Sequence, residues 1–147
     1  YELVYVVADE RDLIGVRTNV RADPPEDVYL YRVAMPRESA RRLFREYLRR
    51  MNELRAHPAF YNTATTNCTT MALVNTRVNG ELSLWNWKIL LSGYLPELAW
   101  ERGRLDRELP FAELRRRSHI NEAARAAGID AADFSARIRE GLPAPAR

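Results

Sequence analysis

The sequence predicts an α+β fold in which short N-terminal strands precede a mostly helical remainder. Residues 3–7 and 28–33 are rich in β-branched and aromatic side chains, as buried strands are. Apolar side chains at positions 40, 43, 44, 47, 48, 51 and 54 repeat at the spacing of one helix face. The change from strand pattern to helix pattern along the chain is what indicates the α+β class.

The remaining elements follow from local signals. Residues 9–12 form a charged turn or one turn of helix, and residues 13–19 are strand or irregular. The helix ends at His57, because the following Pro58 disfavours helical geometry in the residue before it. Further helical segments are predicted at 68–78, 83–91, 93–100, 111–117, 119–127 and 130–139, the last capped by Asp130.

Length and composition indicate one globular domain over residues 1–140, followed by a flexible tail at 141–147. The formal net charge is +3, but 20 acidic residues are interleaved with 23 basic ones and no long block of like charge occurs. We therefore expect no nucleic-acid partner. A single cysteine and two scattered histidines lack the spacing of metal ligands, so no metal site and no cofactor are expected.

The single cysteine, Cys68, follows a stretch of hydroxyl and amide side chains and precedes an apolar helical pattern. Asn67 is a good N-cap, which would place Cys68 in the first turn of a helix. The free N–H groups and the positive end of the dipole there favour a thiolate, the nucleophile of acyl transfer. The alternative is that Cys68 is a small buried apolar residue, as most single cysteines are.

Four motifs in order resemble a known family, the Lnb-type periplasmic domains, long described as a domain of unknown function. The motifs are Glu10-Arg11-Asp12-Leu13-Ile14, Arg17-Thr18-Asn19, Glu26-Asp27-Val28-Tyr29-Leu30-Tyr31, and Tyr61-Asn62 leading to Asn67-Cys68-Thr69-Thr70. The resemblance runs to about residue 139 and implies a permuted papain-like domain of the NlpC type. The family's namesake is a lipoprotein intramolecular transacylase. Its members are typically tethered to a membrane, with this domain in the periplasm or outside the cell.

In the permuted order that the resemblance implies, the catalytic histidine precedes the cysteine, on an early strand. This chain opens inside a strand pattern and has no histidine before His57. We therefore expect that the chain lacks the N-terminal part of the family and that the base lies upstream. Within the chain, His57 and His119 are the other candidate bases, although a histidine at a helix end commonly stabilises that end.

Other candidate site residues have two interpretations each. Tyr61 either holds the loop or donates toward an oxyanion, or it is a packed tyrosine with its hydroxyl satisfied. Asn67 and Thr69 either support the cysteine or satisfy first-turn backbone groups. Arg17 and Asn19 either bind an anionic head group or staple a loop.

The sequence and the resemblance together predict a cell-envelope enzyme that forms a thioester on Cys68 and passes the acyl group to an amine or to water. Its expected partners are lipoprotein or phospholipid acyl groups and a membrane surface. The alternative is a non-catalytic envelope module that binds lipid or peptidoglycan in the same cleft.

Overall fold

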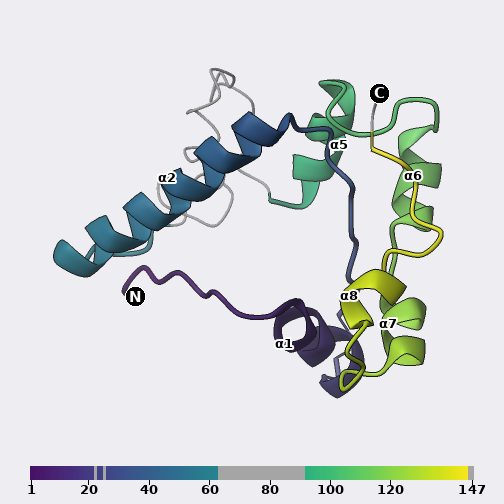
Figure 1. Ribbon diagram of the computed structural model, residues 1–147, viewed down its shortest axis with the longest axis horizontal. Coiled ribbons are helices and arrows are strands. Elements are labelled where there is room, and N and C mark those ends of the chain that lie inside the picture. Colours follow the sequence, from purple (N-terminus) through teal and green to yellow (C-terminus); the bar gives the residue numbers. More distant parts are fainter. Residues whose placement is uncertain (22, 25, 63–91, 146–147) are drawn as a thin grey trace. The chain divides into compact units, whose positions relative to one another are not determined.

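The computed structural model describes residues 1–21, 23, 24, 26–62 and 92–145 (Figure 1). These residues fall into two compact units, each built from parts distant in sequence. Unit 1 contains Tyr1–Val6 and the described residues of Met35–Ala99, and unit 2 contains the described residues of Val7–Ala34 and Trp100–Arg147. The expectation of a single domain over residues 1–140 stays a prediction.

Unit 1 is built on one long helix, α2 (Arg37–Ala56), which the apolar spacing predicted. It starts directly after Pro36 and ends before His57, whose φ of −134° and ψ of 85° are not helical. The residue before a proline avoids helical geometry, so the predicted stop at His57-Pro58 is confirmed. A short 3₁₀ turn, η3 (Ser92–Tyr94), leads into α5 (Leu95–Glu101), where a helix was predicted.

The N-terminal residues of unit 1 are extended beside the chain that follows α2. The Leu3 N–H donates to the Ala59 carbonyl at 2.8 Å, and the Tyr61 N–H donates to the Tyr1 carbonyl at 2.8 Å. The Tyr5 ring meets the Tyr47 ring of α2 edge-on, with centroids 6.3 Å apart. Unit 1 therefore joins the N-terminus to both α2 and the residues after it.

Unit 2 begins with α1 (Glu10–Gly15), which passes into a π-helical turn, η1 (Val16–Val20). The Asp9 carboxylate caps α1 by accepting from the Arg11 N–H at 2.9 Å. Gly15 lets the chain approach another segment, because a Cβ there would lie 2.6 Å from Ile129 Cγ2. The charged turn at residues 9–12 is thus the start of a helix, and residues 13–19 are helical rather than strand or irregular.

The rest of unit 2 comes from the C-terminal third of the chain, as α6 (Phe111–Arg117), α7 (Asn121–Ala127) and α8 (Phe134–Arg137). The first has the bounds that were predicted, whereas the single helix predicted at 130–139 is only α8 with turns around it. The core of unit 2 consists of buried apolar side chains from α7, α8 and the residues next to them: Ile120, Ala124, Ala127, Phe134 and Ile138. Ile14, Val28 and Leu30 from the N-terminal part pack against this core.

The α+β, papain-like fold prediction is wrong for the described part of the chain, which is helical and contains no strand. Within the described ranges, residues 3–7 form no bridge themselves, although the preceding Glu2 forms an isolated antiparallel bridge with Phe60, and residues 28–33 contribute one between Tyr29 and His119. A β-branched run becomes a strand only where several neighbours pair with it and cover its side chains. Here Val4, Val6 and Val7 stay exposed, while Val28 and Leu30 pack on helices instead.

Candidate functional site

The proposed nucleophile and its closest predicted supports, Cys68, Asn67 and Thr69, lie outside the residues that the structure describes. The thiolate hypothesis and its helix N-terminus therefore stay predictions. The other candidates can be located, two in unit 1 and three in unit 2.

His119 forms the most developed polar arrangement among these candidates. Its Nε2 lies 3.1 Å from the Asp27 Oδ1, and both side chains are reachable by solvent. The His119 ring is tilted against the Tyr29 ring with centroids 5.2 Å apart, and the Arg115 guanidinium carbon lies 5.0 Å from the centre of that tyrosine ring. A carboxylate that holds one ring nitrogen orients the imidazole and leaves the other nitrogen for proton transfer.

The backbone explains why Asp27 meets a residue so distant in sequence. The Ile120 N–H donates to the Val28 carbonyl at 3.0 Å, and the Leu30 N–H donates to the Ser118 carbonyl at 2.8 Å. Asn121 completes the pairing, since its side chain accepts from the Val28 N–H and donates to the Glu26 carbonyl, both at 2.8 Å. Residues 26–30 are thereby fixed alongside residues 118–121.

Arg17 and Asn19 hold segments of unit 2 together. Arg17 donates to the Leu13 carbonyl at 2.7 Å and pairs with Glu26, which also accepts from Arg21 at 2.5 Å. Asn19 donates to the Ala124 carbonyl at 3.3 Å and accepts from the Thr18 hydroxyl at 2.6 Å. Arg17 thus links η1 to the loop that carries Glu26, and Asn19 links η1 to α7, while binding of an anionic head group by these residues stays a prediction.

His57 and Tyr61 lie in unit 1. His57 is exposed at the end of α2, where its backbone N–H donates to the Glu53 carbonyl at 2.8 Å. Tyr61 is also exposed, and its backbone bonds to Tyr1. Neither residue has a carboxylate partner within the described ranges comparable to the one that His119 has.

Sequence reasoning missed Asp27, although it belongs to one of the motifs that carry the resemblance. No local signal connects position 27 with position 119, because the pairing depends on a tertiary contact between a loop and the start of α7. The described ranges contain no group of three acidic, histidine or cysteine side chains that could hold a metal ion. No helix within them is long and apolar enough to span a membrane.

The described part of the chain is mostly helical, and the comparison with known families indicates where the domain is located. The family model of the Lnb N-terminal periplasmic domain matches residues 1–96, well over half of the chain. The chain belongs to this family, and the membership indicated by the four motifs is confirmed, although the match is shorter than residues 1–139. The domain therefore has a periplasmic, envelope-associated role. No curated protein and no solved structure matches the chain.

Proposed function

We propose that this domain is a thiol-dependent acyltransferase or hydrolase of the cell envelope, with Cys68 as its nucleophile. The observation that carries the proposal is that Asn67-Cys68-Thr69-Thr70 falls inside the stretch that matches the family. The family resemblance suggests ester-linked acyl chains of lipoproteins or phospholipids as substrates.

The proposed reaction has two steps that balance. The Cys68 thiolate attacks the carbonyl carbon of an acyl ester, the carbon–oxygen bond breaks, and the alcohol leaves with a proton from the catalytic acid. A free amine, or water, then attacks the thioester, which releases an amide or a carboxylic acid and restores the thiol. The papain-like fold is not needed for this chemistry, which depends on local geometry alone.

The chain contains two candidate proton carriers, His57 and His119. Asp27 holds the His119 ring at 3.1 Å, as an orienting carboxylate does in acid–base pairs, whereas His57 has no comparable partner among the described residues. The third candidate is the base that the sequence predicts upstream of residue 1, so substitution of each histidine tests which of the three acts on Cys68.

The test is the pH dependence of Cys68 alkylation by iodoacetamide in the unmodified chain, His119→Ala and His57→Ala. We expect an apparent thiol pKa below the ~8.5 of a free cysteine in the unmodified chain, and a return toward that value only in the variant that lacks the base. A slow reaction with an ordinary thiol pKa in all three proteins would refute the nucleophilic role of Cys68. A lowered thiol pKa that is unchanged in both variants would exclude His57 and His119 as its base.

A second assay distinguishes transfer from hydrolysis. A synthetic lipopeptide with ester-linked acyl chains and a free N-terminal amine is incubated with the domain and followed by mass spectrometry. Intramolecular transfer removes the free amine without changing the mass, whereas hydrolysis lowers the mass by one acyl chain. A thioester adduct on Cys68 that hydroxylamine releases would identify the intermediate.

The second candidate function is a non-catalytic module that binds lipid or peptidoglycan. Exposed apolar side chains in unit 1, including Val4, Phe44 and Leu48, favour this candidate. It predicts ligand binding that persists in Cys68→Ser, together with an unreactive thiol.

A further inference from the structure

α2 carries an exposed apolar strip that the described residues of unit 1 leave uncovered. Phe44 is 65% exposed and Leu48 is 43% exposed, one turn apart on the same line of the helix. Arg37 lies seven residues before Phe44, and Arg55 lies seven residues after Leu48. Seven residues are about two helical turns, so both arginines lie on the same face of α2 as the two apolar side chains. Only one residue of the whole helix is buried, and that residue is Glu46 rather than an apolar side chain.

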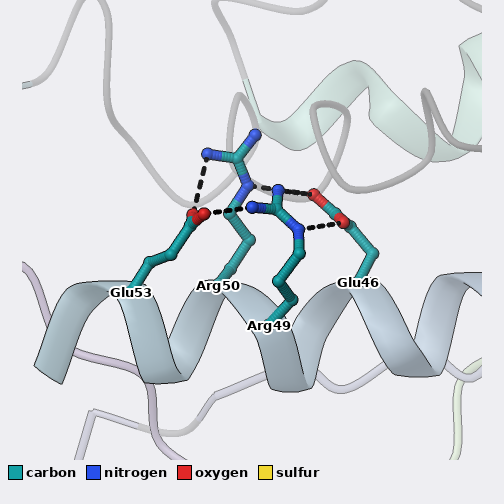
Figure 2. A network of polar contacts seen from close by, with 4 residues as sticks. All are labelled: Glu46, Arg49, Arg50 and Glu53. Atoms are coloured by element: carbon teal, nitrogen blue, oxygen red, sulfur yellow. Dashed lines mark hydrogen bonds and ion pairs between the residues drawn. The ribbon is translucent and has the colours of Figure 1, made fainter. Parts of the chain in front are cut away.

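A network of four charged side chains with balanced charge lies on the opposite flank of α2. Glu46 accepts from Arg49 through two hydrogen bonds of 2.6 and 2.8 Å and from the Arg50 Nε at 3.0 Å (Figure 2). Glu53 pairs with both arginines in turn. Two carboxylates and two guanidinium groups cancel, so this network adds no net charge to the helix.

Most of the excess charge lies at or beside the exposed strip, with Arg42 on the other side of the helix. α2 contains seven arginines and three glutamates, a formal charge of +4. Arg37, Arg45 and Arg55 make no ion pair with any residue in the described ranges, and Arg41 pairs only with the exposed Glu38, at 2.7 Å. Phe44 and Leu48 are therefore bordered by guanidinium groups whose charge is not neutralised within the described ranges.

We propose that this face of α2, the strip of Phe44 and Leu48 with Arg37, Arg45 and Arg55, binds an anionic lipid surface. A helix with arginines beside an exposed Phe–Leu strip and low mean hydropathy lies in the plane of a bilayer interface, with the apolar side chains in the acyl region and the cations among the phosphates. At 20 residues α2 is ~30 Å long, enough to contact several head groups.

Charge decides between this occupant and a second copy of the chain. Two α2 helices packed strip to strip would bring their unpaired arginines together, and like charges in contact oppose association. A lipid surface with anionic head groups supplies the counter-charge and the apolar layer at once. The extracytoplasmic location also brings the domain beside envelope membranes. This inference does not depend on the reactivity of Cys68.

The test is co-sedimentation of the full chain, carrying Cys68→Ser, with vesicles of phosphatidylglycerol and phosphatidylcholine or of phosphatidylcholine alone. We expect binding to the anionic vesicles that weakens as salt is raised, and at least tenfold weaker binding to phosphatidylcholine. Arg45→Gln should weaken binding to anionic vesicles about fivefold. The double variant Phe44→Ser, Leu48→Ser should weaken it about tenfold or more, because two apolar side chains no longer enter the bilayer.

Two matched variants control for charge and apolarity. Arg42→Gln removes the same charge from the opposite side of α2, and Val33→Ser removes an exposed apolar side chain from unit 2. Both should bind anionic vesicles as tightly as the parent, and circular dichroism of all variants should show the same helix content. A dye placed at position 44 through Phe44→Cys should shift its emission to the blue on vesicles, whereas a dye at position 42 should not.

Any of four results would overturn the proposal. One is equal binding to anionic and zwitterionic vesicles. Another is undiminished binding by the Phe44→Ser, Leu48→Ser variant, and a third is equal losses in Arg42→Gln and Arg45→Gln. The fourth is a monomer–dimer equilibrium in sedimentation velocity that the double variant abolishes while no vesicle binding is seen, which would assign the strip to a second copy.

Discussion

Asn121 is the residue whose removal should most directly disturb the His119 arrangement. The Asn121 side chain is only 3% exposed, and its amide forms hydrogen bonds with two backbone groups, the Val28 N–H and the Glu26 carbonyl. Asn121→Ala leaves the Val28 N–H and the Glu26 carbonyl without these partners. A buried group left unsatisfied costs about 1–3 kcal/mol, and these two contacts are only part-buried, so we expect unit 2 to lose about 2–4 kcal/mol of unfolding free energy.

Two variants calibrate this loss. Asn121→Asp retains an acceptor for the Val28 N–H but cannot donate to the Glu26 carbonyl when ionised, so its loss should lie between those of the parent and the alanine variant. Glu122→Ala changes the exposed neighbour and should alter stability by less than ~0.5 kcal/mol.

Amide hydrogen exchange measures the effect in unit 2 itself. The Val28, Leu30 and Ile120 amides all take part in the pairing and should exchange faster in Asn121→Ala, with urea unfolding giving the free energy. A loss below ~0.5 kcal/mol with unchanged protection of Val28 would refute the argument that Asn121 fixes the loop carrying Asp27.

Three further predictions concern the two units. Arg49, then Arg50, lowers the pKa of Glu46 to about 2, so its carboxylate stabilises the fold above pH 4.5 and that contribution is lost as the pH falls from 4.5 to about 2. Glu46→Gln should be less stable at neutral pH, and urea midpoints should converge with those of the parent near pH 2; a constant difference would contradict this account. Phe134→Ala leaves a cavity in the buried core of unit 2 and should lower the free energy of unfolding, measured in urea, by about 3–5 kcal/mol. The exposed control Glu140→Ala should lower it by less than ~0.5 kcal/mol. A chain ending at residue 96 should lose amide protection at residues 14 and 28, because the buried side chains that they pack against are gone; retained protection would show that residues 7–34 fold alone.

The elements that could be predicted are those with a strong local signal. α2 follows from a long apolar repeat that ends at a proline, and α6 follows from a short helical pattern after Pro110. Such elements need little information from the rest of the chain, so the sequence pattern is sufficient to predict them.

The helical stretch at Val16–Val20 could not be predicted in this way, because valine, threonine and asparagine are weak helix formers. Tertiary contacts override that preference: Arg125 donates to the Thr18 carbonyl at 3.0 Å and Asn19 donates to α7. The strand prediction failed for the same reason, since residues 28–33 have strand propensity but Val28 and Leu30 pack against a helical core.

For the candidate site, the sequence identified His119 as one of two histidines but could not identify its partner. The Asp27 contact depends on Asn121, on two backbone hydrogen bonds and on the cation of Arg115 above Tyr29, none of which has a local signature. The proposed roles of Cys68, Asn67 and Thr69 await experiment.

The two-part construction of unit 2 has a consequence for when it can fold. Every buried apolar side chain in the described ranges lies at or after Leu98, whereas α1 and the Asp27 loop lie near the start of the chain. A ribosome releases those early residues long before the segment that covers them, so unit 2 can close only after the last helices have emerged. Such a delay keeps a polypeptide unfolded while it is being made, the state in which a protein destined for the far side of a membrane is most readily exported.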